Sequence, residues 1–133
     1  MRSPRDILAD AATIAVVGAS RYPEKAAHSV PFQLRRHGWR IIPVNPNTTE
    51  LWGEPCYATL ADIPEPVDLV NVFRPSADAT DVVRQAIAIG AKAVWLQQDI
   101  VSPEGRRMAE AAGVDYVEDR CTAVVRAAHQ LSR

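Results

Sequence analysis

The sequence predicts an α/β fold in which helices cover both faces of a parallel, five-stranded sheet. Short apolar runs rich in β-branched residues alternate along the chain with amphipathic segments that begin at helix-capping residues. Strands that alternate with helices in this way pair in parallel through right-handed crossovers. With 133 residues, of which 47% are hydrophobic and 23% charged, the chain matches one globular domain with a continuous core. We therefore expect residues 1–133 to form a single three-layer domain.

The first half of the chain predicts two helices and three strands. A short helix over 3–11 precedes "TIAVVG" (13–18), an unbroken apolar run typical of a central strand buried on both faces. The helix over 27–38 should start near residue 27 or 28, because Pro31 is tolerated only in a first turn. Further elements are a strand at 39–46, an irregular stretch at 47–66 with a short helix near 59–63, and a strand at 67–73. Pro43 has no N–H, so the strand at 39–46 is expected to fray there or to lie where one sheet hydrogen bond is dispensable.

The second half continues the alternation and ends on a helix. Ser76 and Ser102 are the predicted N-caps of two of its helices. Its elements are helices over 76–90, 102–113 and 121–131, and strands over 91–97 and 114–119. The resulting domain is Rossmann-like, with the five strands expected in the order 3-2-1-4-5.

Composition excludes several classes of partner. A formal net charge of −1 argues against a dedicated nucleic-acid binder. No apolar stretch reaches the roughly 20 residues that cross a bilayer, and the N-terminus lacks the apolar core of a signal peptide, so we expect a cytoplasmic protein without membrane contact. Cys56 and Cys121 lie far apart without metal-binding spacing, so reduced thiols and no metal site are expected.

A ligand of such a sheet binds beyond the carboxyl ends of its strands, which selects five segments before any motif is considered. They are 18–25, 45–47, 73–76, 97–100 and 119–121. In the first of them, Gly18 would let the backbone approach a phosphate, with the amides of Ala19 and Ser20 and the Ser20 hydroxyl as donors. Arg21 and Lys25 would neutralise the charge. The alternative is that Gly18 merely turns the chain and the basic pair is solvated.

The dinucleotide fingerprint G-x-G-x-x-G is not met. Ser20 and Pro23 stand where its second and third glycines would be, and Asn45 replaces the acidic residue that grips a ribose. Bound NAD is therefore the weaker interpretation.

Several motifs in compatible order, "VGASRYPEKAAHSV", "IIPVNP", "LWGEPCYATLADIPEPVDLVNVFRP", "AKAVWLQ" and "YVEDRC", together resemble the small, single-domain coenzyme A-binding proteins. These are similar to the N-terminal, CoA-binding domain of the succinyl-CoA synthetase α subunit. The resemblance covers nearly the whole chain. It implies a Rossmann-type domain that holds CoA across the strand ends, with the G-A-S turn and the lysine downstream of it at the phosphates.

Carried over by position, the resemblance implies roles for residues at all five strand ends. It places Gly18, Ala19, Ser20, Arg21 and Lys25 at the CoA phosphates and ribose, Val44, Asn45 and Pro46 beside the nucleotide, Phe73, Arg74 and Pro75 beside the pantetheine or pyrophosphate, Trp95 and Gln97 along the pantetheine, and Arg120 and Cys121 at the floor. The chain departs from the family at "KAAHSV", where the family commonly has a glycine after the lysine.

Some of these residues have a structural alternative. Arg74 could pair with Asp78 one helix turn later, Trp95 could pack in the core, and Gln97 could satisfy loop backbone groups. Cys121 is a candidate reactive thiol because it follows a strand beside Arg120, but it could also be a small buried hydrophobe.

No catalytic residue is assigned, because His28, His37 and His129 are dispersed over helices and none follows a strand. Three candidate functions remain. In the first, the chain is a non-catalytic module that binds CoA or an acyl-CoA as a sensor, carrier or accessory subunit. Alternatively it is the CoA-binding subunit of a multi-chain acyl-CoA ligase whose protein partner supplies catalysis, or an NAD(H)-binding regulatory domain.

Overall fold

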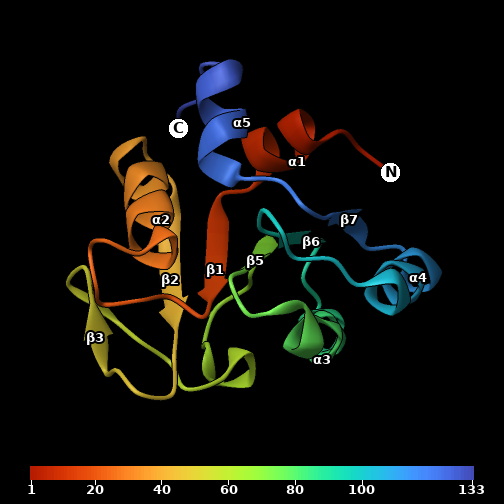
Figure 1. The fold of residues 1–133 in the computed structure, drawn as a ribbon, viewed down its shortest axis with the longest axis horizontal. Coiled ribbons are helices and arrows are strands. Elements are labelled where there is room, and N and C mark those ends of the chain that lie inside the picture. Colours follow the sequence, from red (N-terminus) through yellow and green to blue (C-terminus); the bar gives the residue numbers. More distant parts are fainter.

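Five short strands form one parallel sheet at the centre of the molecule, in a computed structural model that describes residues 1–133 (Figure 1). Its order is β2-β1-β5-β6-β7. The strands are β1 (Thr13–Val17), β2 (Arg40–Val44), β5 (Leu69–Val72), β6 (Ala93–Leu96) and β7 (Asp115–Val117). Each predicted strand is present and one to three residues shorter than expected. The arrowheads of β1 and β2 point to the same edge of the sheet, as parallel pairing requires.

Helices cover both faces of this sheet. One layer holds α1 (Pro4–Asp10), α2 (Ala26–Arg36) and α5 (Thr122–Ala128), and the other holds α3 (Ser76–Ala88) and α4 (Pro103–Ala112). Alternate residues of β1 enter the two cores: Ile14 and Val16 pack with the first layer, and Ala15 with the second. The predicted three-layer, Rossmann-like class is confirmed. No helix has the length and apolar character needed to traverse a bilayer.

The predicted strand order 3-2-1-4-5 is wrong. The third long strand along the chain, β5, pairs with β1 on the side away from β2, so the order in those terms is 2-1-3-4-5. The outer edge of β2 is already occupied, because Tyr57 donates to the Pro43 carbonyl at 3.1 Å and accepts from the Asn45 N–H at 2.9 Å. Pro43 therefore lies in an edge strand, where its missing N–H is tolerated.

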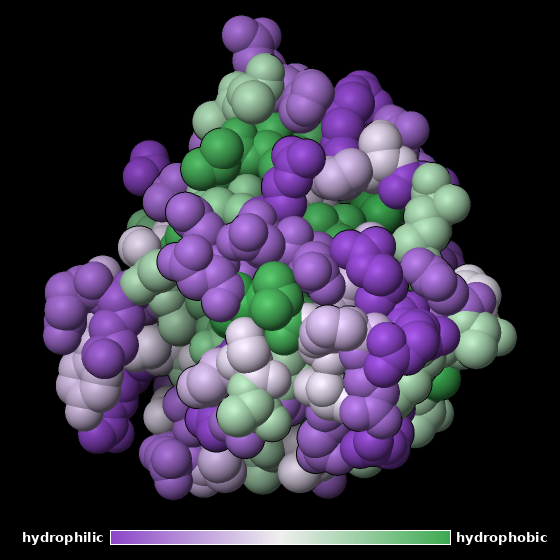
Figure 2. All heavy atoms as spheres, turned by 45° about the vertical axis from the view of Figure 1, so that its right-hand side comes forward, coloured by the Kyte–Doolittle hydropathy of each residue, from purple (hydrophilic) through white to green (hydrophobic).

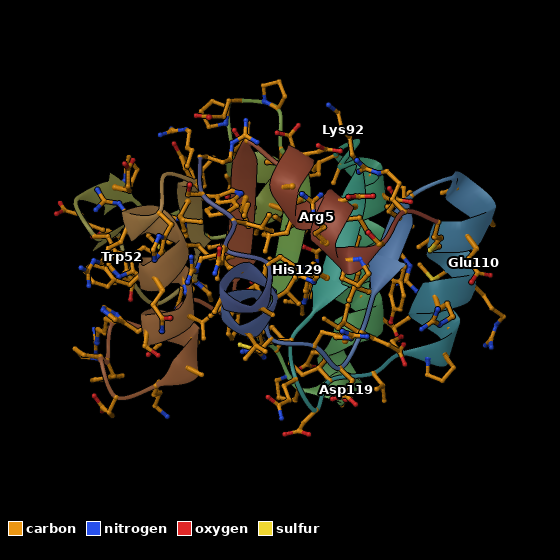
Figure 3. All side chains as sticks on the ribbon, turned by 90° about the horizontal axis from the view of Figure 1, so that it is seen from above. Arg5, Trp52, Lys92, Glu110, Asp119 and His129 are labelled. Atoms are coloured by element: carbon orange, nitrogen blue, oxygen red, sulfur yellow. The ribbon has the colours of Figure 1, made fainter.

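The stretch between β2 and β5 is more ordered than expected. A two-stranded hairpin, β3 (Glu50–Leu51) and β4 (Glu54–Pro55), precedes the 3-10 helix η1 (Leu60–Asp62). Only η1 was expected from the sequence. Trp52, at the tip of the hairpin, lies beside α2 (Figure 3). This hairpin and Tyr57 form the wall that closes the β2 side of the sheet.

Helix starts follow the sequence at α1 and α4, whereas α2 begins at Ala26, before the expected residue 27 or 28, and α3 is not capped by Ser76. Ser3 and Ser102 accept the N–H groups of Asp6 and Gly105 as N-caps. Ser76, predicted as a cap, is instead the first helical residue after Pro75, and its hydroxyl accepts from the Val101 N–H at 3.1 Å. It therefore joins α3 to the loop after β6.

The surface is mostly hydrophilic on the face that Figure 2 shows, with hydrophobic residues in small separate groups. The exposed large hydrophobic residues come from different elements: Met1, Tyr22, Phe32, Val101 and Val124.

Candidate functional site

The site lies at the carboxyl end of the sheet, in the crevice between β1 and β5. The chain leaves β1 toward α2 on one face and leaves β5 toward α3 on the other, which is the switch point where such sheets bind ligands. Gly18 has φ +88°, and a Cβ built on it would lie 3.3 Å from the Phe73 carbonyl carbon and 3.2 Å from Arg74 Cδ. Both the positive φ and the close approach of Phe73 therefore favour glycine at this turn.

The loop after Gly18 and the start of α2 present unpaired backbone donors. The N–H groups of Ala19, Ala26 and Ala27 make no hydrogen bond within the protein, and Lys25 occupies the N-cap position without a side-chain cap. Unpaired amides and the positive end of the helix dipole make such a terminus favourable for an anion. The Ser20 N–H, expected as a further donor to a phosphate, instead donates to the Ala27 carbonyl at 3.2 Å.

Pro31 explains how the Ala27 carbonyl becomes available. Pro31 lies inside α2, beyond the first turn in which it was expected, because the helix begins at Ala26. In a regular helix the N–H of residue 31 would bond to the carbonyl of residue 27, but proline has no N–H. Ser20 takes that carbonyl instead, so the missing helix bond fastens the loop to α2.

Two cationic side chains lie in this loop without a carboxylate partner. Arg21 donates to the Tyr22 hydroxyl at 2.9 Å and its guanidinium carbon lies 5.1 Å from the centre of that ring. Lys25 makes no ion pair, and both side chains are exposed. Arg74 differs, because it pairs with Asp78 at 3.0 Å, the structural alternative considered for it. Arg21 and Lys25 are therefore the two cations of this loop without an ion pair, and the exposed Glu24 between them is also unpaired.

Asn45 holds the neighbouring loop in place. Its side-chain N–H donates to the Ala19 carbonyl at 2.8 Å, and its side-chain oxygen accepts the Asn47 N–H at 2.8 Å. The residue that takes the place of a ribose-binding carboxylate is thus used within the protein, linking the ends of β1 and β2.

Three cavities open along this end of the sheet. The first, of about 390 Å³ on the α3 face, is lined by Val17, Gly18, Val44, Asn45, Pro46, Asn47, Ala58, Thr59, Arg74, Asp78, Asp81, Val82 and Gln85. The second, of about 330 Å³ over the loop, is lined by Gly18, Ala19, Ser20, Arg21, Tyr22, Lys25, Asn45, Asn47 and Thr48. The third, of about 480 Å³ beside the start of α2, is lined by Ala26, Ala27, Val30, Phe73, Gln97, Gln98, Asp99, Ile100 and Cys121.

Most predicted site residues line these cavities, and three do not. Trp95 is fully buried in the core, where its indole N–H donates to the Arg120 carbonyl at 2.9 Å, so it offers no surface to a ligand. Arg120 and Pro75 lie outside the three cavities. Conversely, Thr59 and Gln85 were not expected, because the sequence does not show that η1 and α3 face the same space.

Gln97 belongs to a buried polar cluster at the floor of the third cavity. Its side-chain oxygen accepts from the Asn71 amide at 3.2 Å and from the Thr122 N–H at 3.4 Å. Asn71 also donates to the Trp95 carbonyl at 3.2 Å, and the Thr122 hydroxyl donates to the Asn71 oxygen at 3.3 Å. These bonds fix the orientation of the Gln97 amide, whose nitrogen has no partner within the protein.

The two cysteines differ in setting. Cys121 is half-buried, precedes α5 and lines the third cavity. Cys56 lies away from that cavity. Burial raises the pKa of its thiol, which donates weakly to the Asn45 carbonyl at 3.7 Å.

His28 has a structural role that the sequence did not reveal. Its Nδ1 lies 2.7 Å from the Ser20 carbonyl, and its Nε2 accepts from the Trp52 indole N–H at 3.3 Å. The indole can only donate, so Nδ1 carries the proton and donates to Ser20. His28 therefore ties the loop to the hairpin. No group of three or more His, Cys, Asp or Glu residues is arranged to hold a metal ion.

Comparisons with known proteins identify the family of this chain and support its fold. Residues 12–127 match the family described as the CoA binding domain. The uncharacterized protein YneT of Bacillus subtilis is 35% identical over 123 residues, covering 92% of this chain and 91% of its own length. A solved structure from Thermus thermophilus, cell-free ID.343, is 42% identical with a TM-score of 0.88, over 93% of this chain and 94% of that one. The ADP-forming acetate–CoA ligase II of Archaeoglobus fulgidus is 31% identical over 74% of this chain, which spans 15% of that protein.

Proposed function

We propose, since the chain belongs to the family of CoA binding domains, that residues 1–133 form one domain that binds coenzyme A or an acyl-CoA through its phosphates at the first strand-to-helix turn. In this proposal the domain is a non-catalytic module that acts as a sensor, carrier or accessory subunit. The fold, the loop and the cavities support different parts of it.

One observation carries the proposal: unpaired backbone N–H groups and two cations without an ion pair meet at the same turn. The free amides of Ala26 and Ala27 lie next to Lys25, with Arg21 in the same loop. CoA carries a pyrophosphate and a 3′-phosphate, so its recognition requires several donors and positive charges. A site built for NAD would instead present a carboxylate to the ribose, where this chain has an asparagine used within the protein.

The cavities suggest how CoA would lie across the turn. The phosphates would lie beside Arg21 and Lys25 in the second cavity and extend to the free amides of Ala26 and Ala27, which line the third cavity. The nucleotide would extend into the first cavity on the α3 face, along Asn45 and Pro46, and the pantetheine into the third cavity on the α2 face, past Phe73. The ligand would thus cross the crevice between β1 and β5.

A second candidate is an accessory role in an acyl-CoA ligase. The similarity to 15% of an ADP-forming acetate–CoA ligase supports it, because the matching segment would supply CoA binding while a protein partner supplies catalysis. Co-purification of the tagged chain with a larger ligase subunit would favour this role over an independent sensor or carrier.

Thermal unfolding with and without ligand tests the proposed binding. A ligand present at 100 times its Kd adds about 2.7 kcal/mol to the free energy of unfolding, so CoA should raise the Tm by several degrees and NAD should not. Lys25→Ala and Arg21→Ala should each weaken CoA binding by about 1 to 3 kcal/mol, because each removes a charge-assisted bond to phosphate. Arg107→Ala, which removes an exposed arginine of α4 that lines none of the three cavities, is the control. Equal Tm shifts by CoA and NAD would favour the NAD(H)-binding alternative.

A further inference from the structure

The third cavity contains a buried hydrogen-bond donor that nothing in the protein uses. Gln97 is 5% exposed, and its oxygen is occupied by Asn71 and by the Thr122 N–H. A backbone N–H is always a donor, so the atom facing Thr122 is the Gln97 oxygen and the amide is not reversed. No buried side-chain nitrogen or oxygen lacks a partner, so the unpartnered Gln97 nitrogen must reach the cavity surface.

The rest of the cavity lining combines apolar side chains with two exposed polar ones, Gln98 and Asp99. Val30, Phe73 and Ile100 contribute hydrocarbon surface, and no lysine or arginine lines the cavity. Asp99, at an exposed position, places a carboxylate at the edge. The Gln97 side-chain N–H, on a residue that is only 5% exposed, favours a ligand that brings an oxygen acceptor, because a donor left without a partner there loses a hydrogen bond. A carboxylate on such a ligand would find no cationic side chain in the cavity and would meet the Asp99 charge, while the free amides of Ala26 and Ala27 favour negative charge only at the start of α2.

The cavity lies next to the proposed phosphate site along the chain, because Lys25, which lines the second cavity, directly precedes Ala26 and Ala27. Ala26 and Ala27, whose free amides start α2, line it at one side, and Gln97 lies at the other, after β6. A ligand anchored by phosphates at residues 21–25 would therefore direct the far end of its pantetheine arm toward Gln97. In a thioester of CoA, the group at that end is an acyl carbonyl.

We propose that this cavity is an acyl pocket: the Gln97 side-chain N–H donates to the carbonyl oxygen of a CoA thioester, and Val30, Phe73 and Ile100 contact a short, uncharged acyl chain. This inference rests on the proposed function and narrows it, because it makes a neutral acyl-CoA, rather than free CoA or a dicarboxylic acyl-CoA, the preferred ligand. Gln97 discriminates between ligands and takes part in no reaction.

Titration calorimetry with acetyl-CoA and S-ethyl-CoA tests the role of the carbonyl, because the two differ at the position of that oxygen. The wild-type protein should bind acetyl-CoA about five- to tenfold more tightly, the effect of one hydrogen bond. Succinyl-CoA should bind more weakly than acetyl-CoA. Equal affinity for acetyl-CoA and S-ethyl-CoA would overturn the pocket, and succinyl-CoA binding as tightly as acetyl-CoA would overturn the preference for an uncharged chain. Neither measurement needs a variant.

Gln97→Glu removes the donor and keeps an oxygen for Asn71 and Thr122, so the buried cluster can persist. The preference for acetyl-CoA over S-ethyl-CoA should vanish in this variant. Gln98→Glu is the matched control, because Gln98 is exposed at the same cavity and receives the same charge, and it should retain the preference. If Gln97→Glu weakens CoA, acetyl-CoA and S-ethyl-CoA equally, Gln97 binds a pantetheine carbonyl and the acyl pocket is wrong. If no CoA compound binds the wild-type protein, the proposed function itself fails.

Discussion

Replacing Gly18 by alanine tests whether the turn after β1 is as tightly constrained as the structure indicates. The substitution adds one methyl group at φ +88°, where it would meet the Phe73 carbonyl carbon at 3.3 Å and Arg74 Cδ at 3.2 Å. Gly90 is the matched control, because it has φ +78° and nothing within 4 Å of a built Cβ. The two alanine variants share the backbone penalty and differ in the contacts that the methyl group makes.

The expected magnitudes follow from these two terms. A non-glycine residue in the left-handed region costs about 1 to 2 kcal/mol, which applies to both variants. The crowded methyl at residue 18 adds about 1 kcal/mol, the lower end for overpacking, because Arg74 Cδ can move and the Phe73 backbone cannot. For 133 residues the unfolding entropy is about 0.28 kcal/mol per degree. Gly18→Ala should therefore lower the Tm by about 7 to 11 °C and Gly90→Ala by about 4 to 7 °C.

Thermal unfolding followed by circular dichroism measures the difference, and CoA titration of the folded variants measures its functional effect. Gly18→Ala should also weaken CoA binding, since the methyl occupies the crevice that a phosphate must approach, whereas Gly90→Ala should bind like the wild type. Equal Tm values for the two variants would refute the argument that Phe73 crowds the turn. Equal CoA affinity would refute the placement of the phosphates at Gly18.

Two further predictions concern a carboxylate and a thiol. Burial raises the pKa of Asp68, but hydrogen bonds from the N–H groups of Thr13 and Ala12 and the ion pair with Lys92 outweigh burial and lower this pKa below its usual value. The ionised carboxylate therefore stabilises the folded protein above about pH 4, and this stabilisation is lost as the pH falls through the folded-state pKa of Asp68. Urea unfolding should show Asp68→Asn about 1 kcal/mol less stable than wild type at pH 7, with the gap closing below pH 4, and a gap independent of pH would contradict this. Cys121 should attack the disulfide of oxidised CoA, forming a protein–CoA disulfide and releasing one CoA thiolate, because Cys121 lines the third cavity. Intact-mass analysis should find this adduct in Cys56→Ser and not in Cys121→Ser, and the absence of an adduct in Cys56→Ser would show that the Cys121 thiol does not react.

Local sequence patterns predicted the helices and strands of this fold well, whereas the long-range pairing of the strands was predicted less well. The apolar run of β1 and the serines that cap α1 and α4 act within a few residues, so they can be recognised in the sequence. The strand order depends on whether β5 pairs with the outer edge of β2 or with the free edge of β1, and in the structure Tyr57 occupies the outer edge of β2. No residue of the β5 segment carries that information, which is why the predicted order was wrong.

The candidate site shows the same division. Gly18, Arg21 and Lys25 follow one strand, so their proximity was predictable from the sequence. The Gln97 cluster joins residues from β5, the end of β6 and α5, and its free nitrogen becomes evident only once Asn71 and Thr122 are seen to occupy the oxygen. Trp95 illustrates the opposite case: it lies inside the predicted strand and packs in a core, because helices cover both faces of the sheet.

The proline in α2 has a consequence for the entropy of ligand binding. Because Pro31 leaves the Ala27 carbonyl free for Ser20, and His28 holds the Ser20 carbonyl, the loop at the turn is fastened on both sides before any ligand arrives. A loop that is ordered on folding has little conformational freedom left to lose on binding, so more of the interaction energy appears as affinity. The absence of a backbone N–H at Pro31, in the middle of α2, thus preorganises the loop at the proposed phosphate site.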